Sequence, residues 1–258
     1  MNTVAFHTLG CKVNQYDTQA MLERFKAAGY TVVPFDGKAD VYVLNTCTVT
    51  GTGDKKSLQI TRRLRRQVPE SEIVLCGCLA QRMGEKLRET GARLILGTQH
   101  RAEVVELLEK AVREGSQLCA VDDLTAAPFE EMTITDQEEH TRAILKIQEG
   151  CNNHCTYCII PSVRGPIRSR SLADIRKEAQ RLADAGYTEL VLTGIHLSSY
   201  GKDRPEKQET LLDAIQAVQD CEGVRRIRLG SLEPTIATKE CAARRKGRDK
   251  VCPQFPLA

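Results

Sequence analysis

The sequence AILKIQEGCNNHCTYC, residues 143–158, joins an apolar run to three closely spaced cysteines. The apolar run has the length and composition of a buried strand. Cys151, Cys155 and Cys158, here called the loop cysteines, follow it directly, with three and then two residues between them. We expect them on a loop at the carboxyl end of a strand, the edge where barrels of alternating strands and helices carry their chemistry. This stretch therefore predicts both a fold and a site.

Three thiols on one loop can hold metal in two ways. A structural zinc ion takes four closed ligands, and His154 is the available fourth, although its ring would have to fold back on the same loop. A cubane iron–sulfur cluster is usually held by four thiolates, so a set of three leaves one iron open for a small ligand. The spacing favours the three-thiolate cluster, with zinc and unliganded thiols as the alternatives.

The residues after this loop continue the alternation of strands and helices. Helical periodicity over 172–186 and 209–220 alternates with apolar runs over 189–194 and 226–233. Such βα units predict a barrel, but only about three are complete, and a barrel needs roughly 200 residues or more. We expect a partial barrel over residues 142–258, from a chain that is truncated in this domain.

The first half of the chain has its own alternation. Short apolar runs are separated by amphipathic segments such as 17–30, 55–67 and 101–115. This pattern predicts an α/β domain with a doubly wound, mostly parallel sheet over residues 1–115. The acidic segment 116–141 has no helical or strand period and is predicted to be a linker between the two domains.

Three cysteines of the first half follow predicted strands. Cys11, Cys47 and Cys78, here called the N-terminal cysteines, come at or just after the ends of three such runs. The carboxyl ends of parallel strands share one edge of a sheet, so these thiols are predicted to meet there. They could form a second cluster site, or each could be a small buried residue of the core, as free cysteines often are.

The charge is unevenly distributed although its net value is only +3. Residues 51–68 carry six basic side chains and one acidic, whereas residues 122–140 carry seven acids and no Lys or Arg. In the helix predicted over 55–67, four arginines fall largely off the apolar face: Arg62, Arg63, Arg65 and Arg66. This pattern suits a polyanion such as RNA, and a solvated helix face is the alternative.

The amino terminus and the cysteine content bear on the compartment. The first residues have no basic segment followed by a long apolar run, so neither a signal peptide nor a membrane anchor is predicted. Eleven cysteines in such a chain indicate metal or redox chemistry in a reducing cytoplasm rather than a disulfide framework. We expect a cytoplasmic protein without a membrane partner.

These motifs together resemble one known family. The stretch CNNHCTYC is similar to the radical S-adenosylmethionine (SAM) signature, with Tyr157 at its aromatic position. The stretches LGCKVNQYDT, NTC and GCLAQ resemble the three N-terminal motifs of the radical SAM methylthiotransferases, and RGPIRSR, LTGIHLSSYG and LGSLEP resemble their barrel segments. The residues that follow Gly10 and Cys11 are most similar to those of the branch that modifies threonylcarbamoyladenosine beside the tRNA anticodon.

The resemblance implies a function and its cofactors. The N-terminal cysteines would hold an auxiliary 4Fe-4S cluster, and the loop cysteines a second 4Fe-4S cluster that binds and cleaves SAM to give a radical. The implied reaction replaces an adenine C–H hydrogen of tRNA by a methylthio group, with electrons from a donor such as flavodoxin or ferredoxin. The alternatives are another branch, acting on isopentenyladenosine tRNA or a ribosomal-protein aspartate, and a non-catalytic iron–sulfur fragment that binds RNA.

The same resemblance nominates residues for binding the cofactor, and these are Tyr157, Gly194, His196, Ser231 and Glu233. His196 lies in a segment that should border SAM, while Glu233 either contacts cofactor or substrate or caps a helix. No catalytic residue is assigned. Other cysteines match no motif and are interpreted as structural or without a role: Cys76, which we expect in the core on the same strand and face as Cys78, and Cys119, Cys221, Cys241 and Cys252. A structural role is also expected for His7.

Overall fold

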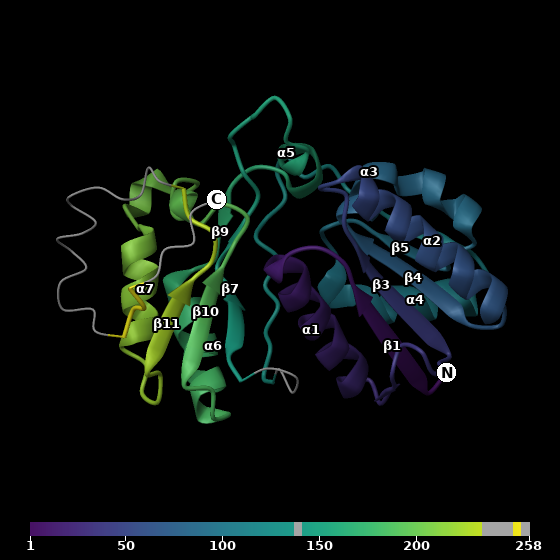
Figure 1. Cartoon of the computed structure of the whole chain (residues 1–258), viewed down its shortest axis with the longest axis horizontal. Helices are drawn as coiled ribbons and strands as arrows, with labels where there is room; N and C mark the ends of the chain where they lie inside the picture. Colours follow the sequence, from purple (N-terminus) through teal and green to yellow (C-terminus); the bar gives the residue numbers. More distant parts are fainter. Residues whose placement is uncertain (137–140, 234–249, 254–258) are drawn as a thin grey trace. The chain divides into compact units, whose positions relative to one another are not determined.

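The computed structural model describes residues 1–136, 141–233 and 250–253. The chain forms two compact units, which are described one at a time (Figure 1). Unit 1 consists of residues 1–132 and 155–164, and unit 2 of residues 133–154 and the described part of 165–258. Cys241 and the basic residues around it lie outside the described residues.

Unit 1 is built on a six-stranded parallel sheet with the order β2-β1-β3-β4-β5-β6. The strands are β1 (Thr3–Thr8), β2 (Thr31–Val32), β3 (Val41–Thr46), β4 (Glu72–Gly77), β5 (Leu94–Leu96) and β6 (Leu118–Ala120). The order reverses at β1, as in doubly wound sheets whose ligands bind at the carboxyl edge of the strands. The predicted fold class of this half is confirmed.

Helices cover both faces of this sheet (Figure 1). The helical segments of unit 1 are α1 (Lys12–Ala27), α2 (Gly51–Gln67), the short α3 (Cys78–Met83), the 3-10 segments η1 (Gly84–Thr90) and η2 (Arg101–Glu103), α4 (Val104–Arg113) and α5 (Ile160–Arg164). Side chains of α1 and α4 form one core cluster with one face of the sheet, and those of α2 and η1 form a second cluster with the other face.

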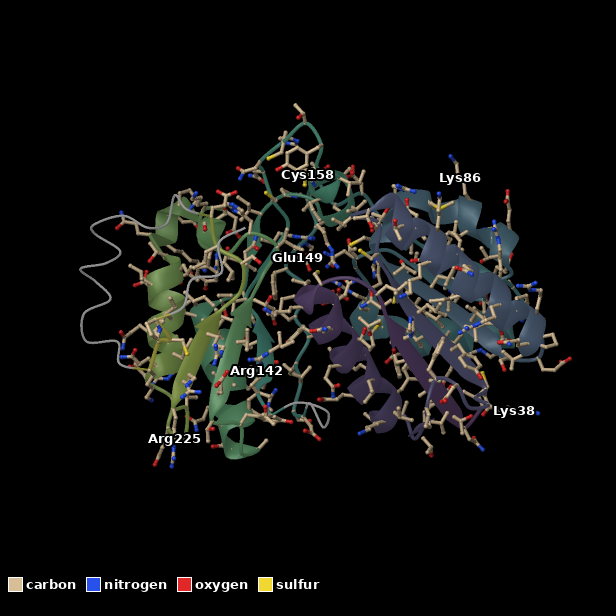
Figure 2. The ribbon with its side chains drawn as sticks, viewed as in Figure 1. Lys38, Lys86, Arg142, Glu149, Cys158 and Arg225 are labelled. Atoms are coloured by element: carbon tan, nitrogen blue, oxygen red, sulfur yellow. The ribbon has the colours of Figure 1, made fainter. Side chains whose placement is uncertain are left out.

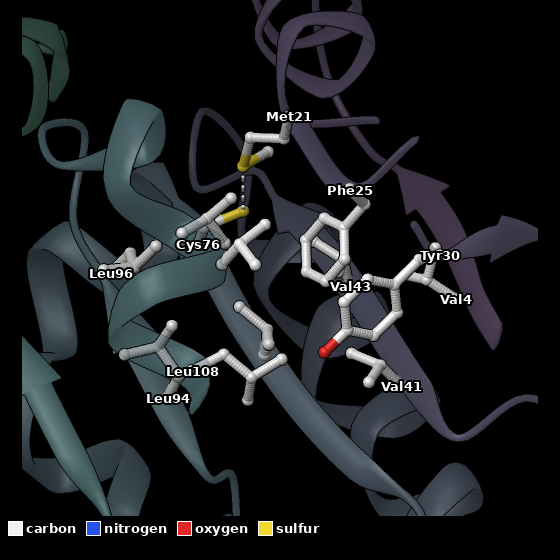
Figure 3. Packing of buried hydrophobic residues seen from close by; sticks show 13 residues of the cluster. Val4, Met21, Phe25, Tyr30, Val41, Val43, Cys76, Leu94, Leu96 and Leu108 are labelled. Carbon is white, nitrogen blue, oxygen red and sulfur yellow. Dashed lines mark hydrogen bonds between the residues drawn. The ribbon is translucent and has the colours of Figure 1, made fainter. Parts of the chain in front are cut away.

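Cys76 lies in the cluster between the sheet and helices α1 and α4 (Figure 3). Its thiol is fully buried and lies 3.9 Å from Sδ of Met21. Burial raises the pKa of this thiol to about 12, so it stays protonated. The predicted core role is confirmed, but the predicted shared face with Cys78 is wrong, because the strand ends at Gly77 and Cys78 begins α3.

Unit 2 contains a three-stranded parallel sheet with the order β11-β10-β7. Its strands are β7 (Ala143–Lys146), β10 (Glu189–Thr193) and β11 (Arg226–Leu229), and a small antiparallel pair is formed by β8 (Gln148–Glu149) and β9 (Arg168–Ser169). The helices are α6 (Leu172–Asp184), η3 (Leu197–Ser199), η4 (Pro205–Lys207) and α7 (Leu211–Gln219). Successive parallel strands joined through helices are the βα units predicted for a partial barrel.

Two features of unit 1 differ from the sequence expectation. Helix α1 begins at Lys12, five residues earlier than predicted, with Cys11 as its N-cap. Strand β6 lies within the segment 116–141, which was expected to be a linker, and pairs with β5. The predicted division into domains at residues 115 and 141 stays a prediction.

None of the helices in the described ranges is both long and apolar enough to cross a membrane.

Candidate functional site

The N-terminal cysteines lie at the ends of three neighbouring strands. Strands β1, β3 and β4 are adjacent in the sheet, and Cys11, Cys47 and Cys78 follow them within three residues. Cys11 is exposed at the amino end of α1, where the helix dipole favours negative charge. Cys47 is partly exposed and Cys78 is buried. The predicted gathering of these positions at the carboxyl edge therefore follows from the strand order.

Asn14 ties the loops of the first two cysteines together. Its Nδ2 donates to the backbone oxygen of Leu9 at 2.6 Å and to that of Thr46 at 3.1 Å. A Cβ added at Gly10 would lie 3.2 Å from Sγ of Cys47, so the loop that carries Cys11 passes directly over that thiol. A larger residue at position 10 would fill this space, and its φ of +109° also favours glycine.

The third cysteine is contacted by a buried arginine. Nε of Arg164 donates to Sγ of Cys78 at 3.2 Å, and its Nη1 lies 3.2 Å from Oδ2 of Asp17. Its Nη2 also donates to Oδ1 of Asn14. Asp17 forms a second ion pair with Arg101, and all three charged side chains are at most 1% exposed. One polar network therefore joins Cys78 to the residue that holds the other two cysteine loops.

The thiols of the N-terminal cysteines are a ligand set that fits an iron–sulfur cluster. Thiolates are the ligands that such clusters take from proteins, and three adjacent strands present them at one edge. Within the described ranges, no three Cys, His, Asp or Glu side chains converge as the ligands of a single ion would. A cubane has a different requirement, because each thiolate binds a separate iron atom.

The loop cysteines are held at both ends of their loop. In unit 2, the backbone N–H of Cys151 donates to the oxygen of Gly165 at 3.0 Å, and that of Asn153 to Sγ of Cys151 at 3.3 Å. In unit 1, the N–H of Cys158 donates to the oxygen of Cys155 at 2.9 Å, which places these two cysteines on one turn before α5. Figure 2 labels Cys158 of this turn. Cys155 is exposed, and Cys151 is buried.

Two of the predicted cofactor residues contact each other in unit 2. Nε2 of His196, in the loop after β10, lies 2.7 Å from Oε1 of Glu233, in the segment after β11. Nδ2 of Asn153 donates to the same oxygen at 3.2 Å. Nδ1 of His196 lies 2.6 Å from the hydroxyl of Ser199, which donates to it when Nε2–H donates to Glu233. Residues after β7, β10 and β11 thus meet at the carboxyl edge of the sheet.

Gln148 connects this cluster to the start of the cysteine loop. Its side chain is fully buried, its Oε1 accepts from the backbone N–H of His196 at 2.6 Å, and its Nε2 donates to the backbone oxygens of Glu149 and Gly150 at 2.7 Å each. Gly194 packs directly against it. The other two candidates are exposed: Ser231 follows β11, and Tyr157 is 91% exposed in unit 1.

The arginines of α2 border a groove in unit 1. This α2–η1 groove has a volume of about 560 Å³ and is lined by Arg62, Arg65 and Arg66 of α2 and by Lys86 and Glu89 of η1, among others. Arg62 and Arg66 are exposed, as is Arg63 outside the groove. Arg65 differs from them, because its guanidinium donates to the backbone oxygens of Pro69, Ser71 and Gly91 at 2.6 to 3.2 Å.

Cys119, Cys221 and His7 have surroundings that suit a structural role. Burial, with the charge of Glu85, raises the pKa of Cys119 to about 11, and burial also raises that of Cys221. His7 stacks on Phe35 with ring centroids 4.7 Å apart, and burial together with the charges of Lys56 and Arg63 lowers its pKa.

The contacting residues that were not singled out from the sequence include Asn14, Gln148, Asn153 and Arg164. Asn14 lies inside the quoted motif GCKVNQYDT, and Asn153 inside CNNHCTYC. Arg164 begins the quoted segment RGPIRSR, so the resemblance marks this arginine. The resemblance does not indicate that its side chain contacts Cys78.

Two family models match the chain. The Uncharacterized protein family UPF0004 matches residues 3–97, which include the N-terminal cysteines, and the Radical SAM superfamily matches residues 145–200, which include the loop cysteines. Among solved structures, the radical SAM methyltransferase TsrM from Kitasatospora setae has a TM-score of 0.61 at 14% identity, covering 97% of this chain and 58% of that one. The cobalamin-dependent radical enzyme OxsB has a TM-score of 0.58 at 14% identity, with coverages of 96% and 42%. The fold is thus that of a radical SAM protein, with a partial barrel as predicted.

Relatives among curated proteins narrow the class. The threonylcarbamoyladenosine tRNA methylthiotransferase MtaB of Bacillus subtilis is 47% identical over 93% of this chain, and that of Aquifex aeolicus is 38% identical over 99%. The tRNA-2-methylthio-N(6)-dimethylallyladenosine synthase of Clostridium tetani is 33% identical over 99%. The chain belongs to the radical SAM methylthiotransferase family and is related to its MtaB-type branch. It spans 53%, 62% and 57% of the lengths of these three relatives.

Proposed function

We propose that this chain carries the two cluster sites of a radical SAM tRNA methylthiotransferase that acts on threonylcarbamoyladenosine. The observation that supports it is the set of Cys11, Cys47 and Cys78, which follow three adjacent parallel strands, together with the cysteine loop in the segment that the Radical SAM superfamily matches. The branch rests on the 47% and 38% identical relatives that are named for this substrate. When bound, the clusters supply electron transfer, radical generation from SAM and the sulfur route; the chain's residues hold and orient them.

The proposal assigns each cysteine set one cluster. Cys11, Cys47 and Cys78 would hold the auxiliary 4Fe-4S cluster, and Cys151, Cys155 and Cys158 the cluster that leaves one iron open for SAM. The edge formed by Asn153, His196 and Glu233 would border the cofactor, because it lies at the strand ends of the same unit that carries Cys151. A flavodoxin or ferredoxin would supply the electrons.

The test is anaerobic reconstitution of the chain followed by incubation with dithionite, SAM and tRNA. Mass spectrometry of the digested tRNA should show 2-methylthio-threonylcarbamoyladenosine with the substrate tRNA, and no methylthio product with isopentenyladenosine tRNA. The opposite preference would assign the other branch. Iron-loaded protein that forms no 5′-deoxyadenosine would leave the non-catalytic RNA-binding fragment as the function.

The α2–η1 groove is proposed as a contact for tRNA phosphates. Arg62 and Arg66 border it with exposed guanidinium groups, and Lys86 adds a third cation from η1. Arg65 is not needed as a contact, because its Nη1 and Nη2 groups already donate to backbone oxygens of unit 1. Arginine and lysine side chains that neutralise phosphates make binding depend strongly on salt.

Replacing both Arg62 and Arg66 by Gln should weaken tRNA binding about equally for all sequences. The negative slope of log affinity against log salt concentration should become shallower by roughly 1.4 to 1.8, because each lost phosphate contact removes about 0.7 to 0.9 from its magnitude. The measurement is a binding titration at several salt concentrations. The matched control replaces Lys110 and Arg113 of α4, which are also exposed, by Gln and removes the same charge from the other face of the sheet. Equal slopes for both variants would mean that the groove makes no phosphate contact.

Gly194 offers a test of the cofactor edge. A Cβ at this position would lie 2.8 Å from Cβ and Oε1 of the buried Gln148, which must then move and release the N–H of His196. In a SAM titration, the electron paramagnetic resonance (EPR) signal of the cluster on the loop cysteines should change. Gly194→Ala should raise the SAM concentration that gives half of this change by about tenfold, or ~1.4 kcal/mol. Gly51→Ala is the control, since an added Cβ there meets no atom within 4 Å. An unchanged half-saturation in Gly194→Ala would remove this edge from the cofactor site.

A further inference from the structure

Arg164 is a fully buried cation in direct contact with a cysteine sulfur. Its side chain is 0% exposed, and its Nε donates to Sγ of Cys78 at 3.2 Å. Burying a guanidinium is costly unless its donors are paired. The structure pairs them with two side chains of α1 and one thiol, so the contact with Cys78 is part of a built arrangement.

The rest of the network fixes the direction of the Nε–H group. Oδ1 of Asn14 accepts from Nη2 and Oδ2 of Asp17 lies 3.2 Å from Nη1, which holds the planar guanidinium at two of its corners. Because the five donors of arginine have fixed relative directions, the third corner is then aimed at Cys78. Asp17 is itself held by Arg101, whose other donors bind Glu130 and the oxygen of Thr98.

Cys78 is the N-terminal cysteine that is buried, so water does not screen this contact. A hydrogen bond to a ligating sulfur stabilises the more negative, reduced state of a cluster, and such bonds are among the features that set cluster potentials. The network contains two arginines and two acids, so the effect arises from the directed N–H donor at close range and not from a net charge.

We propose that Arg164 is a positioning residue that donates to the Cys78 thiolate and raises the reduction potential of the cluster on the N-terminal cysteines. The inference rests on the proposed function, because it needs a cluster at that site. Arg164 lies six residues after Cys158 in the chain, so the segment that carries two loop cysteines also supplies the donor that tunes the other cluster.

The experiment uses the full chain in a Cys155→Ala background, so that the cluster on the N-terminal cysteines is observed alone. After anaerobic reconstitution, iron and sulfide are counted, and the reduced fraction is followed by EPR in a redox titration. Arg164→Met should keep its iron and lower the ratio of reduced to oxidised cluster about tenfold at a fixed potential, which is ~59 mV for one electron. Arg164→Lys, which keeps the charge but not the directed Nε–H donor, should shift the potential less.

The matched control is Arg101→Met, which breaks an ion pair with the same Asp17 and leaves Arg164 in place. Its potential should shift much less than that of Arg164→Met, because Asn14 still holds Nη2 of Arg164 and the donor to Cys78 is kept. An equal shift in both Met variants, or none in Arg164→Met, would overturn the inference, and so would failure of both Arg164 variants to fold, because the residue would then be a structural brace. A background protein that binds no iron would instead contradict the proposed function.

Discussion

Replacing Cys155 by Ala is expected to remove about half of the bound iron and all cleavage of SAM. The reason is that the proposed function gives each cluster its own three thiolates, and we expect a cubane that loses one of only three protein ligands not to be retained. Cys155 is exposed, so the substitution leaves the packing of the core unchanged. The measurements are iron and sulfide content after anaerobic reconstitution, and 5′-deoxyadenosine formed after reduction with dithionite.

Cys47→Ala provides the comparison for this result. It should remove the other half of the iron while some cleavage of SAM continues, because the loop cysteines are intact. Cys76→Ala is the control for a thiol in the same unit that is held in the core and not at the sheet edge; it should keep the full iron content. Loss of all iron from either Cys155→Ala or Cys47→Ala would contradict two independent sites.

Asp17→Asn is expected to cause the largest loss of stability in unit 1. Asp17 is fully buried between Arg101 and Arg164, and removing its charge leaves two buried cations without their shared partner. Breaking a buried ion pair from one side costs about 3–5 kcal/mol. Hydrogen exchange of the amides in β1, β3 and β4 reports unit 1 by itself, and their protection should fall by roughly two to three and a half decades at 1.4 kcal/mol per decade.

An exposed ion pair in the same unit is the matched control. Glu85 pairs with Arg88 on η1, and these side chains are 67% and 39% exposed. Glu85→Gln should leave the protection of the sheet amides nearly unchanged, because solvent screens such pairs. If Asp17→Asn behaved like this control, the buried network would contribute nothing to the stability of unit 1.

The sequence was sufficient to predict the α/β fold and the gathering of Cys11, Cys47 and Cys78 at one edge. Periodicity identifies strands and helices, and a parallel sheet places strand ends together whatever the details of packing. Boundaries were harder: Cys11 is not among the residues that mark a helix start, and β6 is a three-residue strand of partly buried side chains.

The buried network was beyond such reasoning. Asp17 and Arg164 are 147 residues apart in the chain, and no local sequence pattern predicts which acidic residue a buried arginine contacts. The same holds for Gln148, which follows an apolar run in the sequence. Its side chain forms hydrogen bonds with the backbone of His196 and of Glu149, and the sequence does not indicate these partners. Motif resemblance marked the segments, whereas only the structure gave the partners.

The discontinuity of unit 1 has a consequence for how the protein is made. The chain leaves this unit after Met132, contributes residues 133–154 to unit 2, and returns with Cys155–Arg164. During synthesis, domains generally fold from the amino terminus as they emerge. Asp17 is translated early, whereas its partner Arg164 follows the loop cysteines in the chain. The buried ion pair between Asp17 and Arg164 therefore cannot form until all six cysteines of the two proposed sites have been translated.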